Sequence, residues 1–378
     1  MALTLNERDR RLDGVRAAMR RDDIDALIVV GTAGTGIPFN GNFAYLTGRT
    51  LFYASAAFYL PLDGEPVSFI PGENQFEDAK RAGWIEHLVL SRQPFADCCR
   101  HLAGAGRAPA RIGVSSLAVL PSPALEEIRG AAPGAELGEA GPLILAMRDV
   151  KSEEEIAIAR RAGEVADIGF FRSLEILGAG LTGFEWKAEA ERVMTAAGAD
   201  GGFNMLGVGR AGGNSDIFRG FVVPPTARAF EDGDLALLEI SPRVEGYYSQ
   251  IVRLVSLGAP EADIAAAHAA CVAAKQKGIA ALRLGARFDE VMAPIERGLA
   301  AAGLGAKSVA TAHTIGLDLS ETVINPRTPG EIAAGMVVTV HPMIELGEWR
   351  QLFTGETYAV GDSGCVCLNR SEDRIYVV

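Results

Sequence analysis

A carboxylate and an imidazole occupy matching places in two similar stretches of this chain. Glu239 ends the run 233–239, and His341 ends the run 335–341, 102 positions later. Each run is a glycine followed by strongly apolar residues, which is the pattern of a buried strand. Two surface residues at strand ends would give the same pattern, but a titratable group that closes an apolar strand favours a cleft. An acid and a base that face one cleft can transfer protons near neutral pH.

These two runs belong to a longer internal repeat. Residues 185–198 resemble residues 290–303, 105 positions later, and residues 155–157 resemble residues 263–265, 108 positions later. Each copy has the pattern of two helices followed by strands. Two copies of this length are too few for a solenoid. They indicate a duplicated domain with a pseudo-two-fold axis.

The part of the chain before the repeat alternates between helix and strand patterns. Residues 6–21 have helical spacing, and residues 24–31 are typical of a buried strand. Residues 56–61 and 66–70 flank an Asp-Gly pair and predict a hairpin. This alternation predicts an N-terminal α/β domain over residues 1–140.

A linker is predicted between the two domains. Residues 141–151 show no helical period and begin with a Gly-Pro pair. Ser152 and Glu155 then have the spacing of a capping box, which begins a long helix. We expect residues 152–378 to form the second domain, with segregated helices and strands, an α+β fold.

The composition excludes several classes of protein. The 378 residues are 48% hydrophobic and 22% charged, with a net charge of −12. A folded chain is expected, and a nucleic-acid binder would be basic instead. The apolar runs are too short for a membrane span, and the N-terminal stretch lacks the apolar core of a signal peptide. The charge and the short apolar runs lead us to expect binding to neither nucleic acid nor membrane. The five cysteines form no zinc pattern, so we expect a cytoplasmic protein.

Five short segments carry a resemblance to a known family: residues 148–152, 233–234, 246–253, 313–318 and 335–338. Through them, residues 152–378 resemble the pita-bread fold of creatinase, aminopeptidase P, prolidase and methionine aminopeptidase. Residues 1–140 more weakly resemble the N-terminal domain of creatinase and prolidase. The resemblance implies an α/β N-terminal domain, a pita-bread catalytic domain with an internal pseudo-two-fold repeat, and a homodimer.

In the peptidases of this family, the resemblance implies two metal ions held by five side chains. The matching positions here are Glu239, Gln250, His313, His341 and Gly355. Two divalent ions close together need several anionic oxygens, and one carboxylate does not offset their charge. Glu356 could replace Gly355 only if the register slips by one residue. We therefore predict no metal cofactor, with a single divalent ion at Glu239, His313 and His341 as the minority alternative.

Creatinase is the family precedent for this fold working without a metal, through a histidine that acts as acid and base on a C–N bond. Its position is Val222 in this chain, so the resemblance does not imply creatine as the substrate. His313 and His341, beside Glu239 and Gln250, could instead act as general base and general acid. The sequence thus predicts an enzyme, a metal-independent hydrolase of a C–N bond in a small nitrogen-containing molecule.

Three alternative functions stay open at this point. They are an Xaa-Pro aminopeptidase-like or dipeptidase-like metallohydrolase, a lyase acting on a small zwitterion, and a non-catalytic peptide-binding module. Substrate contacts are expected from Arg210, Tyr248, Arg327 and Tyr53. The two arginines would also fit as exposed loop residues, and the aromatic residues as part of the core.

Overall fold

The computed structural model describes residues 3–33, 41–51, 53–104, 106, 108–117, 120, 122–210, 224–304, 312–345 and 351–378. The chain forms two compact units, residues 1–148 and 149–378. The fold is an α/β N-terminal unit and a pita-bread C-terminal unit with an internal repeat.

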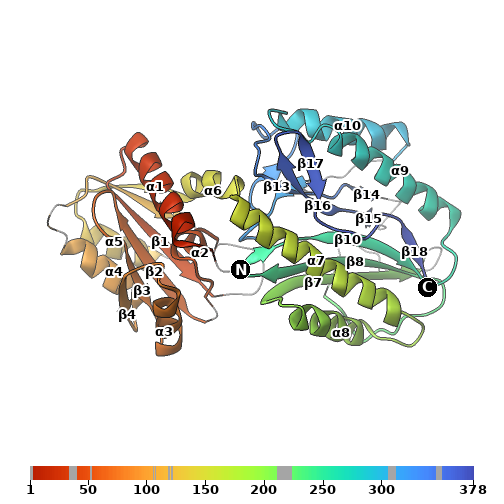
Figure 1. The fold of residues 1–378 in the computed structure, drawn as a ribbon, viewed down its shortest axis with the longest axis horizontal. Helices are drawn as coiled ribbons and strands as arrows, with labels where there is room; N and C mark the ends of the chain where they lie inside the picture. The colour runs from red at the N-terminus through yellow and green to blue at the C-terminus, as the bar shows by residue number, and fades with distance from the viewer. Residues whose placement is uncertain are drawn as a thin grey trace. The chain divides into compact units, whose positions relative to one another are not determined.

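A mixed sheet with helices on both faces makes up the first unit (Figure 1). Its helices are α1 (Leu5–Arg21), α2 (Gly41–Thr47), α3 (Glu73–Ala82), α4 (Pro94–Ala103), α5 (Ser122–Ala131) and α6 (Gly141–Asp149), the last of which reaches the boundary between the units. Its strands are β1 (Ala26–Thr32), β2 (Ser55–Pro61), β3 (Val67–Ile70), β4 (His87–Leu90), β5 (Arg111–Ser115) and β6 (Glu136–Glu139). The strand order is β4-β3-β2-β1-β5-β6, and β2 and β3 form the predicted hairpin.

The segment 141–151 differs from the linker that its sequence predicts, because most of it is helix α6. A carboxylate oxygen of Glu139 accepts a hydrogen bond of 2.7 Å from the backbone N–H of Gly141, at the start of the helix. Proline is tolerated in the first helical turn, where its missing N–H would have no partner within the helix. Ile144 is fully buried and anchors the helix in its unit.

The described part of the second unit contains two five-stranded sheets, a small two-stranded sheet and four long helices. The helices are α7 (Glu153–Ile176), α8 (Gly183–Ala196), α9 (Ala262–Ile279) and α10 (Phe288–Ala301). The strands are β7 (Gly201–Arg210), β8 (Asp234–Val244), β9 (Tyr247–Tyr248), β10 (Ile251–Ser256), β11 (Ala312–Thr314), β12 (Val323–Ile324), β13 (Val337–Val340), β14 (Met343–Glu345), β15 (Gln351–Phe353), β16 (Glu356–Gly361), β17 (Gly364–Cys367) and β18 (Ile375–Val377). The predicted capping box at Ser152 and Glu155 is present at the start of α7.

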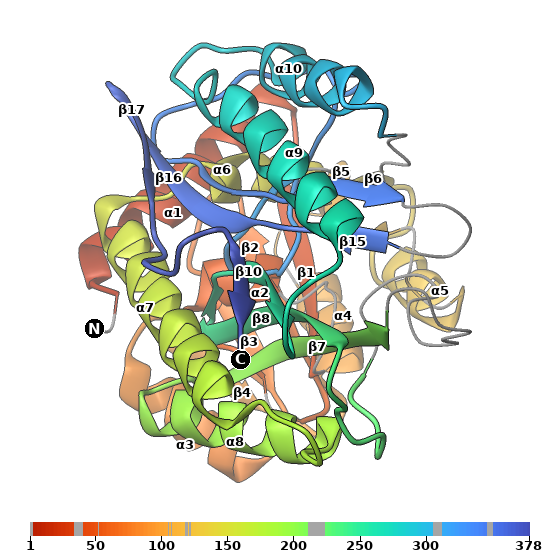
Figure 2. The same cartoon turned by 90° about the vertical axis from the view of Figure 1, so that its right-hand side faces the viewer.

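The repeat seen in the sequence is visible in how these elements are paired. One sheet has the order β18-β10-β8-β7 and the other the order β12-β11-β13-β16-β17. Helices α7 and α8 accompany the first sheet, and α9 and α10 pack side by side in the other copy (Figure 2). Strands β8 and β13 are equivalent, since they carry the matching runs that end at Glu239 and His341.

The two sheets meet at a seam between Val252 and Gly355. Val252 N–H donates to the carbonyl of Gly355 at 2.8 Å, and Gly355 N–H returns a bond to the carbonyl of Val252 at 3.3 Å. A large apolar cluster that includes Val252, Leu254, Val338 and Val340 extends across the seam. The seam therefore fixes the residues of one sheet relative to those of the other. None of the helices in the described ranges is long and apolar enough to cross a bilayer.

Candidate functional site

One row of side chains crosses the second sheet and ends at the seam. His313 of β11 is opposite Thr339 of β13, which is opposite Thr357 of β16. Directly opposed residues of an antiparallel sheet point to the same face. The hydroxyls of Thr339 and Thr357 lie 3.1 Å apart, in agreement with this arrangement. His341, two residues after Thr339, also lies on this face.

Gln250 joins the row through its backbone. The hydroxyl of Thr357 accepts a hydrogen bond from the N–H of Gln250 at 3.0 Å and donates one to its carbonyl at 2.9 Å. Two residues further on, Val252 pairs with Gly355 at the seam, and Glu239 of β8 is opposite Val252. The sheet registers thus place Glu239 and Gln250 on the same face as the two histidines.

Glu239 and Gln250 are in direct contact. The side-chain Nε2 of Gln250 donates a 2.6 Å hydrogen bond to Oε1 of Glu239, and both residues are buried. Burial raises the pKa of Glu239 to about 7, against the opposing effect of the bond from Gln250. This carboxyl group therefore gains and loses its proton close to neutral pH. The Oε1 of Gln250 is buried and has no protein partner among the described residues.

His313 and His341 form the second contacting pair. Their ring centroids are 5.0 Å apart with an interplanar angle of 66°. Nδ1 of His313 donates to the backbone carbonyl of Thr314 at 2.9 Å, which leaves Nε2 as the acceptor of the neutral ring. Burial lowers the pKa of His313, and burial together with the neighbouring His313 lowers the pKa of His341 to about 3. Both rings are therefore neutral at physiological pH.

The missing side chain at Gly355 is explained by the position of His341. A Cβ atom on Gly355 would lie 2.4 Å from Cβ of His341 and 2.9 Å from the carbonyl oxygen of Val340. Real Cβ atoms do not approach other atoms this closely, and the second of these neighbours is backbone. His341 thus uses the space that a side chain at position 355 would need. Glu356, the adjacent residue, points to the opposite face.

Glu356 belongs to a buried charge network on that opposite face, which the sequence patterns did not predict. The Nζ of Lys275, from α9, is 2.6 Å from Oε1 of Glu356 and also contacts Asp373. Arg253 pairs with Oε2 of Glu356 at 2.8 Å and donates to the carbonyl of Gly355 at 2.7 Å. The one available signal was a lysine within the alanine-rich run of α9.

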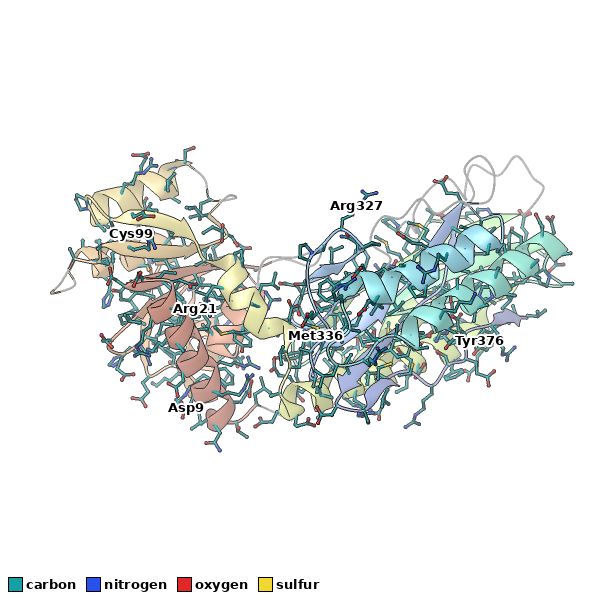
Figure 3. All side chains as sticks on the ribbon, turned by 90° about the horizontal axis from the view of Figure 1, so that it is seen from above. Asp9, Arg21, Cys99, Arg327, Met336 and Tyr376 are labelled. Carbon is teal, nitrogen blue, oxygen red and sulfur yellow. The ribbon has the colours of Figure 1, made fainter. Side chains whose placement is uncertain are left out.

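The predicted substrate-binding residues are dispersed. Tyr248 is buried in the second unit, with the guanidinium of Arg243 5.9 Å from its ring centroid. Arg327 is exposed on a loop and projects away from the ribbon (Figure 3). Arg210 ends β7, and its side chain lies outside the described residues, as do residues 211–223 with Val222. Tyr53 is in the first unit, where its backbone carbonyl accepts a bond from Gln75.

Comparison with known proteins decides the family. The model for "Metallopeptidase family M24" matches residues 157–368, and the model for "Creatinase/Prolidase N-terminal domain" matches residues 11–150. The first match covers more than half of the chain. The chain belongs to metallopeptidase family M24.

Individual relatives match this M24 chain over nearly its whole length. A Bacillus subtilis protein named "Uncharacterized peptidase YqhT" is 26% identical over 92% of this chain and 97% of the relative. The Xaa-Pro dipeptidase of Pyrococcus horikoshii is 24% identical over 94% of this chain and 95% of the relative. The crystal structure of dipeptidase PepE from Mycobacterium ulcerans has a TM-score of 0.81 at 23% identity and covers all of both chains.

Membership in M24 corrects two expectations. The prediction of a metal-independent hydrolase that acts on a small non-peptide molecule is wrong, because the family consists of metallopeptidases and the relatives are named as peptidases and dipeptidases. The prediction of no cofactor is wrong for the same reason, since the comparisons point to metal ions. The peptidase-like alternative is the one that they favour.

The side chains of this M24 chain do not, however, fit the pair of metal ions that the family implies. Gln250 is neutral and directs its N–H toward Glu239, and position 355 has no side chain. Glu356 cannot substitute, because Lys275 and Arg253 already neutralise it on the other face. Across the described ranges, no group of three or more His, Cys, Asp or Glu residues is arranged to hold a metal ion. Neither the pair nor the single-ion arrangement is thus assembled by these residues.

Proposed function

We propose that this protein is a hydrolase that cleaves the amide bond of a short peptide. Support comes from its membership in family M24 and from full-length relatives named as peptidases and dipeptidases. The observation that carries the proposal is the buried face on which Glu239, Gln250, His313 and His341 form two contacting pairs. These are the positions at which the peptidases of the family are expected to carry out their chemistry.

The chain's own residues have distinct parts in this proposal. Glu239 exchanges its proton near pH 7, which suits a group that accepts a proton from water and passes it to a leaving amine. Gln250 holds one carboxylate oxygen of Glu239 and so fixes the orientation of the carboxyl group. The neutral imidazoles of His313 and His341 accept hydrogen bonds and orient the peptide unit.

A panel of dipeptides that includes Xaa-Pro members tests the proposal. The full chain is incubated with each dipeptide after chelation, and again with added Mn²⁺, Co²⁺ or Zn²⁺, and the amino acids released are quantified. We expect at least one dipeptide to be cleaved. Glu239→Gln, which removes the proton-transfer group, should lower the rate about 10²–10⁴-fold. His313→Ala and His341→Ala, which remove groups that orient the peptide unit, should each lower the rate as well. His87→Ala, which removes an exposed histidine of the first unit, is the matched control and should leave the rate unchanged.

A second candidate function is a peptide-binding module that has no turnover. It is favoured by the neutral side chains at Gln250 and His341 and by the absent side chain at Gly355, which leave Glu239 as the single acid among the five positions. Peptide binding without release of amino acids under any of the metal conditions would select this function and reject the hydrolase. We also propose a homodimer, as the family resemblance implies, which light scattering of the purified chain tests.

A further inference from the structure

Strand β4 lies at one edge of the sheet in the first unit (Figure 1), and no described strand pairs with its outer side. An open edge strand presents backbone N–H and C=O groups to which another strand can bond, and proteins usually protect such an edge with charged side chains, proline or a bulge. The sequence of β4 is His-Leu-Val-Leu, which contains no lysine, acidic residue or proline. Val89 and Leu90 are 37% and 47% exposed, so apolar surface accompanies the open edge.

The opposite edge of the same sheet is protected by charge. Strand β6 begins with Glu136 and ends with Glu139, and both of these side chains are exposed. A second copy of β6 that paired antiparallel with the first would place glutamates opposite each other, which is unfavourable. Strand β6 is therefore a poor partner for itself, whereas β4 carries no such repulsion.

The backbone pairing of β4 determines which of its residues face the open edge. The N–H of Ser91 donates to the carbonyl of Ile70 at 2.9 Å, on the side of β3. Successive residues of a strand direct their backbone groups to alternate sides. The N–H and C=O of Val89 therefore also face β3, and those of Leu88 and Leu90 face outward. Only the outward-facing residues can exchange hydrogen bonds with a further strand, which limits the possible registers.

One of these registers makes the charges that flank β4 complementary. When Leu88 pairs with Leu90 of a second copy, Val89 lies opposite its own equivalent on the two-fold axis. Glu86 is then opposite Arg92 of the second copy, because these residues lie three positions before and three positions after Val89. Both side chains are exposed, and the two-fold symmetry forms the same pair twice. A register shifted by two residues in either direction separates the opposite charges.

We infer that two copies of this chain associate through β4, edge to edge, so that their N-terminal sheets become one continuous sheet. Leu88 and Leu90 of the two copies exchange backbone hydrogen bonds and meet on one face, while the two Val89 side chains meet on the other. The pairs of Glu86 with Arg92 select the register. The inference rests on the homodimer proposed above, whose interface it names. The paired edge is short, so we expect a dissociation constant of about 1–100 μM.

Sedimentation equilibrium of the full chain measures this association over about 1–500 μM, the range of a weak interface. The parent chain should show a monomer–dimer equilibrium. Leu90→Pro removes an outward-facing N–H and no bond to β3, so it should fold like the parent by circular dichroism and remain a monomer. Leu90→Lys should also remain a monomer. Val366→Lys, which places the same charge on the exposed Val366 of the edge strand β17, is the matched control and should associate like the parent.

Charge reversal tests the flanking pairs without changing β4 itself. Glu86→Arg and Arg92→Glu should each weaken the dimer about three- to tenfold, because each puts like charges opposite each other at two symmetric positions. The double variant restores opposite charges and should associate like the parent. Losses that simply add up in the double variant would overturn the register.

Disulfide trapping tests the position of the two-fold axis, in a Cys367→Ser background that lacks the exposed cysteine. Val89→Cys should form a covalent dimer on mild oxidation, because opposed residues of this kind have Cα atoms about 4.5 Å apart, within the range of a disulfide. A mixture of Glu86→Cys and Arg92→Cys chains should also crosslink. Glu86→Cys alone is the control and should not, since its two copies would lie about 20 Å apart along the strands.

The outcomes separate this inference from the other proposals. It is overturned if the chain is a monomer throughout the concentration range, a result that also rejects the homodimer. It is overturned, with the homodimer left standing on another surface, if a dimer forms but folded Leu90→Pro associates like the parent or Val89→Cys gives no covalent dimer. Failure of the chain to cleave any dipeptide rejects the hydrolase and leaves the result for β4 unchanged.

Discussion

Replacing Lys275 by methionine should destabilise the second unit severely. Lys275 is fully buried, and its ammonium binds Glu356 and Asp373. With Arg253 as the second cation, the network holds two positive and two negative charges. The Lys275→Met variant keeps a similar volume but leaves one buried negative charge without compensation. Breaking a buried pair in this way costs about 3–5 kcal/mol. That is about a fifth or more of the stability of a typical domain, which is about 5–15 kcal/mol.

Urea unfolding followed by hydrogen exchange and mass spectrometry measures this effect unit by unit. Peptides from residues 149–378 should lose protection at a lower urea concentration in the variant, while peptides from residues 1–148 serve as the internal reference. Lys277→Met, two residues along the same helix and exposed, should stay within about 0.5 kcal/mol of the parent. Adding Asp373→Asn to Lys275→Met restores the charge balance and should recover part of the loss. The reasoning is refuted if Lys275→Met costs no more than Lys277→Met, or if the second substitution makes the variant still less stable.

Three further predictions follow from the described contacts. Burial raises the pKa of Glu239 from its ordinary 4.5 to about 7, so the folded chain holds this proton more tightly and its stability falls as the pH rises from about 4.5 to 7. Glu239→Gln should flatten that part of the profile of urea midpoint against pH, and an unchanged slope would contradict the assignment. Gly355→Ala should cost about 1–3 kcal/mol in urea unfolding through overpacking, and His341→Gly in the same chain, which removes the Cβ that a side chain at position 355 would meet, should recover part of it; strictly additive losses would disprove the steric explanation. Trp186→Phe removes the 2.8 Å bond from Nε1 to the hydroxyl of Ser173 and should cost about 1 kcal/mol in thermal unfolding, whereas no change would show that the bond contributes nothing net.

Much of the fold could be predicted because its signals are periodic and local. The spacing of apolar residues indicated α1 and the hairpin of β2 and β3, and the capping box at Ser152 marked the start of α7. Helix α6 was missed because a Gly-Pro pair is typical of a linker, and only the three-dimensional position of Glu139 shows that it caps a helix there. Local rules therefore fail where an unexpected neighbour, here a glutamate two residues upstream, completes the element.

The residues that form the candidate site could be predicted, but the contacts between them could not. The repeat alone related Glu239 to His341, and the family resemblance added Gln250 and His313. The hydrogen bond between Gln250 and Glu239 depends on the register of β8 and β10. The network around Lys275 depends on which face each strand presents to α9, which a single sequence does not reveal. The predicted chemistry of the site was wrong because the side-chain types at five positions do not by themselves determine the reaction.

The close packing of Gly355 against His341 has a practical consequence for anyone who wishes to engineer metal binding into this chain. A carboxylate introduced at position 355 alone would run into Cβ of His341 and the carbonyl of Val340. Changing His341 alone would open a void beside an unchanged glycine. A selection that advances through single improving substitutions would stall between these two states. A library for this purpose has to randomise both codons together and include glycine at position 341, because every other residue there keeps the obstructing Cβ.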